Sequence, residues 1–427
     1  MAALLIRGGR VLSPEDALDG RFDLLVEEGV IRQIAPRLTT RADETLDATT
    51  QVVAPGFVDM HAHLREPGGE ASETLATGLA AAVSGGFTAV CAMPNTQPVN
   101  DRPESTRAMI ERAQKLGLAR VFPIAAVTLG SAGESLSDFA ALVEAGAVAF
   151  SDDGRPVKTA GLLRRALRQA ASLDLAIVDH CEDPSLSAGG AVNEGPVADC
   201  LGVRGIPNSS EDVCVARDLI VAEAAGARLH VAHLSTARGV ELVRLGKQRG
   251  VRVTCEVTPH HFTLTDEAVI KHSTLAKINP PLRSARDSDA LLAGIADGTV
   301  DAIATDHAPH ASELKQKPLA EAAFGMIGFE TALGLALTQL VHTGRISLWH
   351  LVLLMSTNPA RIINQPLGRL AVGRAADITV FDPSLEWTYH AAGSRSKSRN
   401  SPFDGWRLKG AATATVVAGR IVYRRPP

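Results

Sequence analysis

The fold is decided by the stretch Val52-Val53-Ala54-Pro55-Gly56-Phe57-Val58-Asp59-Met60-His61-Ala62-His63, in which an apolar run leads directly into two histidines. A short apolar run of this kind predicts a β-strand. His61 and His63 stand two positions apart, so their side chains would lie on the same face of an extended chain. The stretch therefore predicts a strand whose carboxyl end carries two imidazoles able to hold one metal ion.

Seven further apolar runs follow the first, Val52–Met60, with helix-period segments between them. The later runs are Thr88–Met93, Val121–Val127, Val148–Phe150, Ala176–Val178, Leu229–Ala232, Val251–Val257 and Ala302–Ala304. The helical segments include Glu73–Val83, Glu104–Leu116, Leu162–Ala171, Asp212–Ala225 and Leu291–Ile295. Eight β/α units over about 310 residues predict an α/β protein built as a (β/α)8 TIM-like barrel.

A doubly wound parallel sheet would also alternate strands with helices. Such a sheet usually has fewer strands, and it often carries a glycine-rich phosphate loop after a strand. Neither GxGxxG nor GxxxxGK[ST], the two patterns of such loops, occurs in the chain. The number of runs and the lack of these loops therefore favour the barrel over the open sheet.

Both ends of the chain hold short β-type runs separated by glycine turns, such as Val30–Ile34 and Ala376–Phe381. Each end alone is too small for a good core, so we expect the two to pack together as one small β-sandwich domain. The predicted organisation is two sandwich segments, 1–54 and 366–427, with the barrel between them at 55–365.

The composition is that of an ordinary globular protein, with 45% apolar and 21% charged residues among 427. A net charge of −4 does not form the basic footprint expected for nucleic acid or an anionic membrane. The five cysteines are scattered without a CxxC pair, as is typical of a reducing compartment. We therefore expect a soluble, cytoplasmic protein with no nucleic-acid partner and no membrane span.

Residues of metal-ligand type follow five of the eight apolar runs. They are His61 and His63 after the first, Asp153 after the fourth, His180 after the fifth, His233 after the sixth and Asp306 after the eighth. In a parallel barrel the carboxyl ends of all strands open on the same mouth, where such enzymes keep their active sites. Four imidazoles and two carboxylates at that mouth predict a centre for one or two Zn²⁺ ions.

Several motifs resemble those of the amidohydrolase superfamily, and in particular those of its type I dihydroorotases. The segments that carry the resemblance are Pro55–His63, His63–Gly68, Met93–Thr96, Phe150–Gly154, Ile278–Arg283, Thr305–His310 and Ser401–Phe403. Together they span nearly the whole chain. The form that this chain resembles has an aspartate, here Asp153, where hydantoinases, allantoinases and other dihydroorotases have a bridging carboxylated lysine.

The resemblance implies a zinc-dependent, reversible cyclisation of N-carbamoyl-L-aspartate to L-dihydroorotate plus water, a step of de novo pyrimidine (UMP) biosynthesis. It implies a metal-bound hydroxide as the nucleophile, and Asp306 as both a metal ligand and the general acid/base. We expect two Zn²⁺ ions per subunit. The residues that the resemblance assigns to the small-molecule substrate are His63, Arg65, Asn95, Asn279, His310, Phe324 and Gly325.

The family often forms homodimers, and some members assemble with aspartate transcarbamoylase, so both are expected partners although the sequence identifies no interface. Two alternatives stay open. A related cyclic amidase, such as a dihydropyrimidinase or allantoinase, would have a bridging lysine in place of Asp153. A non-catalytic dihydroorotase-like scaffold of aspartate transcarbamoylase would have lost metal ligands. The aspartate and the complete ligand set favour the active dihydroorotase over both.

Other polar residues are expected to play structural parts. His260 and His261 after the seventh run would support the site, and Cys181 would point to the strand face opposite the neighbouring ligand. The polar stretch Ala311–Ala323 is predicted to be a mobile lid. The following Ala322–Gly325 has alanine where the family pattern has proline, so this loop would be less rigid than in relatives.

Overall fold

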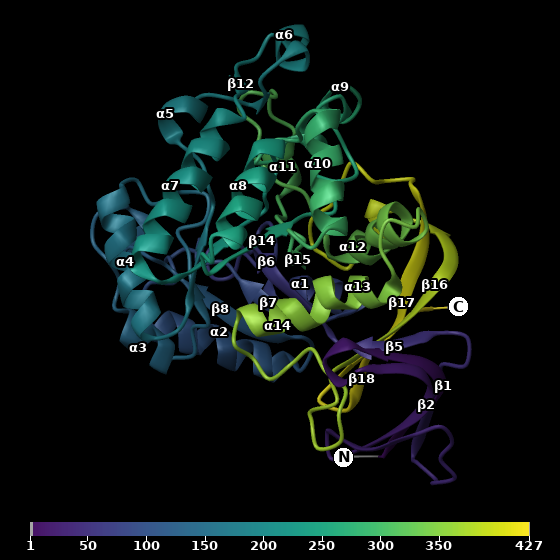
Figure 1. Cartoon of the computed structure of the whole chain (residues 1–427). Helices are drawn as coiled ribbons and strands as arrows, with labels where there is room; N and C mark the ends of the chain where they lie inside the picture. The colour runs from purple at the N-terminus through teal and green to yellow at the C-terminus, as the bar shows by residue number, and fades with distance from the viewer. Residues whose placement is uncertain (1–2, 427) are drawn as a thin grey trace.

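A nearly closed parallel barrel forms the centre of the computed structural model, which describes residues 3–426 (Figure 1). Its eight strands pair in chain order. They are β6 (Phe57–Ala62), β7 (Phe87–Ala92), β8 (Arg120–Ala125), β9 (Ala149–Phe150), β10 (Ala176–Asp179), β13 (Arg228–Val231), β14 (Val253–Val257) and β15 (Ala302–Ile303). A parallel bridge between Ala62 and His307 joins the last strand to the first. The predicted (β/α)8 barrel is confirmed.

Helices cover the outside of the barrel. The longer ones are α1 (Leu75–Ser84), α2 (Pro103–Leu116), α4 (Ala160–Ser172), α7 (Ser209–Ala225), α8 (Ala237–Gln248), α10 (Ala285–Ala296) and α12 (Phe329–Ala336). Shorter elements in the connections are α3 (Phe139–Glu144), α5 (Pro184–Ser187), α6 (Pro196–Leu201), α9 (Ala268–His272), α11 (Ser312–Lys315), α13 (Leu348–Val352), α14 (Asn358–Ile362), β11 (Val192–Asn193) and β12 (Gly205–Ile206). Thr74, Thr159 and Thr236 accept backbone N–H groups and so fix where α1, α4 and α8 begin. None of the described helices is both long and apolar enough to cross a membrane.

The strands of the barrel separate two apolar layers. Along β6, Val58 and Met60 belong to the inner apolar layer, whereas Phe57 packs outward among the residues of the outer layer. An irregularity in the pairing with β7 between Asp59 and Ala62 interrupts this alternation, so His61 also faces the interior. Small side chains such as Ala89 and Ala302 complete the interior layer. Because side chains fill the interior, the barrel is a packed core, and ligands bind at its carboxyl end.

Strands from both ends of the chain form a second eight-stranded sheet. They are β1 (Leu4–Ser13), β2 (Leu18–Glu27), β3 (Val30–Ala35), β4 (Glu44–Asp47), β5 (Val52–Pro55), β16 (Ile378–Thr388), β17 (Arg407–Val417) and β18 (Arg420–Arg424). The two ends meet where β5 pairs antiparallel with β16, and Figure 1 shows the purple and yellow ends of the chain together there. Residues from both ends, among them Ile6, Val53 and Ile378, share one core. The division of the chain into three predicted segments stays a prediction.

The apolar run Val52–Met60 is divided at Gly56, so the prediction of one strand over this run is wrong. The residues before the glycine form β5 of the terminal sheet, and those after it form β6 of the barrel. A Cβ atom on Gly56 would lie 2.0 Å from Thr88 Oγ1 and 2.4 Å from Thr88 Cγ2. Only glycine therefore allows the chain to cross from one sheet to the other so close to β7.

We predict that Gly56→Ala destabilises the protein by about 1–3 kcal/mol, because the new methyl group overlaps a threonine that is itself buried. Thermal unfolding followed by circular dichroism should give a lower Tm. Gly393→Ala is the matched control, since no atom lies within 4 Å of the Cβ position there. The same Tm for both variants would contradict the close approach.

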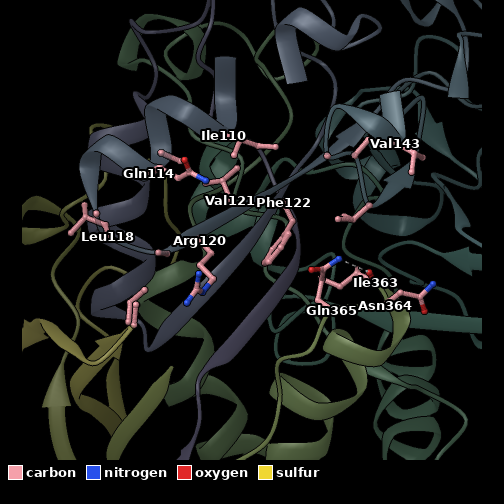
Figure 2. Close-up of a pocket in the computed structure, with 18 of the residues that line it drawn as sticks. Ile110, Gln114, Leu118, Arg120, Val121, Phe122, Val143, Ile363, Asn364 and Gln365 are labelled. Atoms are coloured by element: carbon pink, nitrogen blue, oxygen red, sulfur yellow. Dashed lines mark hydrogen bonds between the residues drawn. The ribbon is translucent and has the colours of Figure 1, made fainter. Parts of the chain in front are cut away.

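The amino-terminal face of the barrel carries a mostly apolar cavity of about 640 Å³ (Figure 2). The start of β8, with Arg120, Val121 and Phe122, lines it together with Ile363 and Asn364. Active sites of parallel barrels lie at the opposite, carboxyl ends of the strands. The cavity is also remote from the predicted ligands, which all follow strand ends, so we place the active site elsewhere.

Candidate metal centre

All six predicted metal ligands lie at the carboxyl ends of barrel strands, and the structure brings them together. His61 lies in β6 and His63 just beyond it, Asp153 follows β9, His180 follows β10, His233 follows β13 and Asp306 follows β15. None of the six is more than 7% exposed. Side chains from five separate strand ends thus form one buried cluster at the mouth of the barrel.

Asp153 lies at the centre of this cluster. Its Oδ1 is 3.3 Å from His61 Nε2, and its Oδ2 is 3.6 Å from His63 Nε2. The same Oδ1 lies 3.7 Å from His180 Nδ1 and 3.6 Å from His233 Nε2. One short carboxylate therefore faces all four imidazoles, which is the placement that a ligand shared by two ions requires.

Two overlapping sets of ligand atoms lie close enough to surround an ion. His61, His63 and Asp306 form one set, and His61, Asp153 and His233 form the other, with the atoms of each within 4.8 Å of one another. Within the first set, Asp306 Oδ1 is 3.1 Å from His63 Nε2. The mouth can therefore hold a metal ion, and the two sets overlap at His61.

Unpartnered atoms test whether the cluster fits a metal. His61 Nε2 and Asp153 Oδ1 are both buried, and neither has a hydrogen-bond partner among the described residues. Buried polar atoms are nearly always paired, so two that face each other in this way fit a cation bound between them. Imidazole nitrogen and carboxylate oxygen are common protein ligands of Zn²⁺. The residues present therefore fit a metal centre.

Three residues around the cluster have left-handed backbone conformations. The φ angles are +60° at Arg65, +30° at His233 and +44° at Asp306. Residues other than glycine adopt such angles rarely, at a cost of about 1–3 kcal/mol each, and they concentrate at functional sites. Two of the three are predicted metal ligands, so the backbone strain is concentrated where the chain must aim side chains into the mouth.

Glu256 in β14 contacts the metal ligand His61 from within the barrel, and the sequence analysis did not identify it. Its carboxylate is 2.8 Å from His61 Nδ1 and 3.2 Å from His230 Nε2. Burial alone would raise the pKa of Glu256, but hydrogen bonds from His230 and His61 lower it to about 2. The sequence did contain a signal, because Glu256 is the one acidic residue within the apolar run Val251–Val257. A charge in a buried strand needs a partner, and here that partner orients a ligand.

Asp59, in the middle of β6, is a second charged residue within a buried strand that the sequence analysis did not single out. Its carboxylate accepts hydrogen bonds from Thr305 N at 3.0 Å, from the Thr305 hydroxyl and from His61 N at 3.2 Å. Thr305 immediately precedes Asp306. These contacts therefore tie the end of the eighth strand to the first, and they fix the spacing between His61 and Asp306.

Arg65 and His310 form a second polar group beside the metal ligands. Arg65 Nη2 lies 3.3 Å from His310 Nε2, which is also 2.6 Å from Phe324 O. Burial lowers the pKa of Arg65 to about 10, so the guanidinium stays charged at neutral pH. Burial and the Arg65 charge lower the pKa of His310 to about 3, so its ring is neutral. The pair offers a positive charge to an anionic ligand.

Asn95 and Asn279 face the metal ligands. Asn95 Oδ1 is 2.9 Å from His63 Nδ1, and its amide nitrogen is 3.3 Å from Asp153 Oδ2. Asn279 Nδ2 donates to Glu182 at 2.7 Å, and Glu182 in turn lies 3.3 Å from His180 Nε2. Both asparagines therefore orient ligand side chains, and a role in binding substrate stays a prediction.

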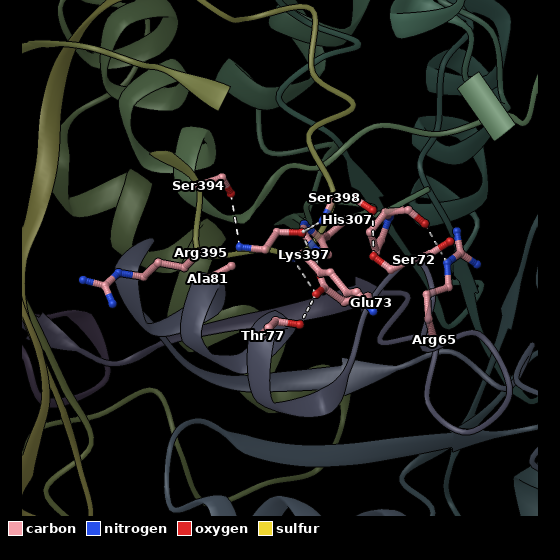
Figure 3. A network of polar contacts seen from close by, with 12 residues as sticks. Arg65, Ser72, Glu73, Thr77, Ala81, His307, Ser394, Arg395, Lys397 and Ser398 are labelled. Carbon is pink, nitrogen blue, oxygen red and sulfur yellow. Dashed lines mark hydrogen bonds and ion pairs between the residues drawn. The ribbon is translucent and has the colours of Figure 1, made fainter. Parts of the chain in front are cut away.

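A polar network behind the mouth holds the end of the eighth strand (Figure 3). Glu73 accepts hydrogen bonds from the Ser396 hydroxyl and from Lys397 N, and its Oε2 is 3.3 Å from His307 Nε2. The His307 ring also stacks on Phe329, with centroids 4.0 Å apart. His307, the residue after Asp306, therefore holds the end of the eighth strand through Glu73 and Phe329 and is not part of the metal cluster.

A second cluster of potential ligands lies behind β10. It consists of Asp179, Cys181, Cys214 and Asp218, all buried. The Arg217 guanidinium donates to Asp218 Oδ1 at 2.6 Å and to Cys214 Sγ at 3.2 Å. The Arg217 guanidinium therefore already balances the negative charge of this cluster. Cys181 belongs to the cluster and so points away from the mouth, as expected from its place beside His180.

Comparisons with known proteins agree with this site. A model of the dihydro-orotase-like family matches residues 50–239. The dihydroorotase of Syntrophus aciditrophicus is 51% identical over 423 residues, which cover 99% of each chain. The dihydroorotase of Pelotomaculum thermopropionicum is 51% identical over 419 residues, 98% of each chain.

A solved structure of an L-hydantoinase (dihydropyrimidinase) from Arthrobacter aurescens has a TM-score of 0.89 with this chain. The match covers 100% of this chain and 97% of the hydantoinase, at 27% sequence identity. This structural match confirms that the barrel with its terminal sheet is an amidohydrolase architecture. The two full-length relatives, each 51% identical to this chain, are dihydroorotases. By this full-length similarity, the chain belongs to the dihydroorotase family.

Proposed function

We propose that the chain is a zinc-dependent dihydroorotase that interconverts N-carbamoyl-L-aspartate and L-dihydroorotate in pyrimidine biosynthesis. The observation that carries the proposal is the six-residue cluster at the barrel mouth, in which His180 contacts Asp153, with the Arg65–His310 pair beside it. The cluster suits hydrolysis of a ring amide, and the pair suits the single carboxylate of dihydroorotate. Family membership supports both assignments.

The metal would be held by His61, His63, Asp153, His180, His233 and Asp306. When bound, Zn²⁺ supplies hydroxide at neutral pH by lowering the pKa of its water, and it polarises the carbonyl under attack. We propose two ions per chain, because Asp153 faces ligands from both overlapping sets. Metal analysis giving one tightly bound ion would overturn the second site.

Asp306 is the proposed general acid/base. In ring opening, a water oxygen bonds to the ring carbonyl carbon, the C–N bond of the amide breaks, and the nitrogen must gain a proton. The Asp306 carboxylate takes the proton from the attacking water and delivers it to that nitrogen. In cyclisation the ureido nitrogen bonds to the side-chain carboxyl carbon and a C–O bond breaks. The same carboxylate then moves the proton from that nitrogen to the departing oxygen, which leaves as water.

The substrate carboxylate would bind at Arg65 and His310. Arg65 supplies the charge, and its Nε donates to Pro309 O at 3.0 Å, which fixes the direction of the guanidinium. Asn95 is the third proposed contact, while Asn279 and the backbone at Phe324 and Gly325 would lie nearer the ring. With these contacts, the binding charge would lie to one side of the substrate and the reacting amide would lie over the metal ligands.

The alternatives are less well supported. A hydantoinase-type enzyme would have a lysine where Asp153 stands, and it would have no need for the Arg65–His310 pair. A non-catalytic scaffold would have no need to retain all six buried ligands. Homodimer formation, assembly with aspartate transcarbamoylase and a cytoplasmic location stay predictions from the family resemblance, and the mass of the protein in solution tests the first.

We predict that removing the metal abolishes turnover reversibly. Ring opening of L-dihydroorotate, followed by its ultraviolet absorbance, should stop after treatment with a chelator and recover when Zn²⁺ is restored, because the nucleophile depends on the ion. Circular dichroism should show that the treated protein stays folded. Zinc-loaded protein that leaves dihydroorotate unchanged would refute the proposed function.

A further inference from the structure

The segment from His310 to Gly325 carries proposed substrate contacts at both of its ends. His310 Nε2 lies 2.6 Å from Phe324 O, so the two ends are joined beside Arg65. The short helix α11 lies between them. Contacts that restrain α11 therefore also limit how far His310 and Phe324 can move.

Lys315, the last residue of α11, is buried within the segment at 5% exposure. Its ammonium donates to three backbone carbonyls, at 3.2 Å to Lys277 O, 2.8 Å to Ala323 O and 2.9 Å to Gly325 O. An ammonium has three N–H donors, and all of them are used here. The bond to Ala323 restrains the backbone at the position where the family pattern has proline.

Lys277 holds the same segment from the opposite side. It is 1% exposed, and its ammonium donates to Leu319 O at 2.7 Å and to Ala320 O at 3.1 Å. The same group lies 4.2 Å from the centroid of the Phe324 ring. Gly325 N also donates to Lys277 O at 2.9 Å, so both lysines contact Gly325, one through its backbone carbonyl and the other through its ammonium.

The two ammonium groups have no carboxylate partner among residues 3–426, since backbone carbonyls accept all of their hydrogen bonds. Burial and the Lys277 charge lower the pKa of Lys315 to about 7. Because this pKa is close to neutral pH, an anion bound nearby would favour the charged form of Lys315.

We propose that Lys315, assisted by Lys277, is a positioning residue for the anionic substrate. Its ammonium holds Gly325 and thereby the His310–Phe324 contact that lies beside Arg65. In this proposal the two lysines hold the segment in place beside the site, and the lid motion predicted from the sequence stays a prediction. This inference rests on the proposed dihydroorotase activity.

Lys315→Met tests the proposal, with Lys317→Met as the matched control because Lys317 is an exposed lysine of the same segment. We expect Lys315→Met to raise KM for L-dihydroorotate about tenfold and to leave kcat within about threefold, since binding away from the reacting amide is lost. Lys317→Met should change neither constant. Zinc content and Tm are measured for both variants.

An unchanged KM in folded Lys315→Met overturns the proposal, as does a loss of kcat at unchanged KM or an equal rise of KM in Lys317→Met. If Lys315→Met does not fold, Lys277→Met carries the same expectation and the same outcomes. Failure of the proposed function would look different, because the zinc-loaded wild-type protein itself would then not turn over dihydroorotate.

Discussion

Asp306→Asn is expected to lower kcat about 10³-fold in both directions while the chain stays folded. Asparagine keeps the size of the side chain but cannot accept the proton that the reaction must move. Burial favours the neutral acid, but the His63 hydrogen bond and the charges of His61 and His63 hold the pKa of Asp306 well below its usual value. The wild-type carboxylate is therefore ionised at neutral pH, which is the form that a proton acceptor must have.

The rates of Asp306→Asn should be measured with saturating zinc, and the bound metal should be quantified in the same sample. Asp297→Asn is the matched control, since Asp297 follows α10, is partly exposed and pairs with Arg244. The control should keep full activity. A zinc-loaded Asp306→Asn enzyme within tenfold of the wild-type kcat would exclude this residue as the proton acceptor.

The barrel and its ligands could be predicted because both follow from a simple pattern. An apolar run marks a buried strand, and the parallel barrel directs every strand end to one mouth. His61, Asp153 and Asp306 could thus be grouped although they are far apart in the sequence. That inference needs only the order of the strands, and it needs no side-chain positions.

The remaining features depend on contacts across the fold. The division at Gly56 arises from the close approach of Thr88 on the next strand, and nothing in the run itself indicates it. Asn95 follows the second run, and only the fold shows that it contacts His63 and Asp153, while its role toward substrate stays a prediction. Lys315 lies in a polar stretch typical of an exposed loop, but it is buried because three carbonyls converge on it.

Glu256→Gln is expected to weaken zinc retention about 10- to 100-fold, although Glu256 does not reach the metal cluster itself. Glu256 Oε1 is 2.8 Å from His61 Nδ1, so that nitrogen carries the proton and Nε2 keeps its lone pair toward Asp153. A glutamine amide has one acceptor oxygen for two histidines. If its NH₂ group faces His61, Nδ1 must accept, and the proton moves to Nε2, where it blocks metal binding.

Competition with a chelator should show faster zinc loss from Glu256→Gln, and excess Zn²⁺ should restore most of the activity, since the residues that touch substrate are intact. Restoration by zinc separates this variant from Asp306→Asn, which no metal concentration should rescue. Glu241→Gln is the control, because Glu241 pairs with Arg238 on the exposed face of α8. Equal zinc retention in the two glutamine variants would mean that the tautomer of His61 is set without Glu256, and that its buried charge serves only the packing of β13 and β14.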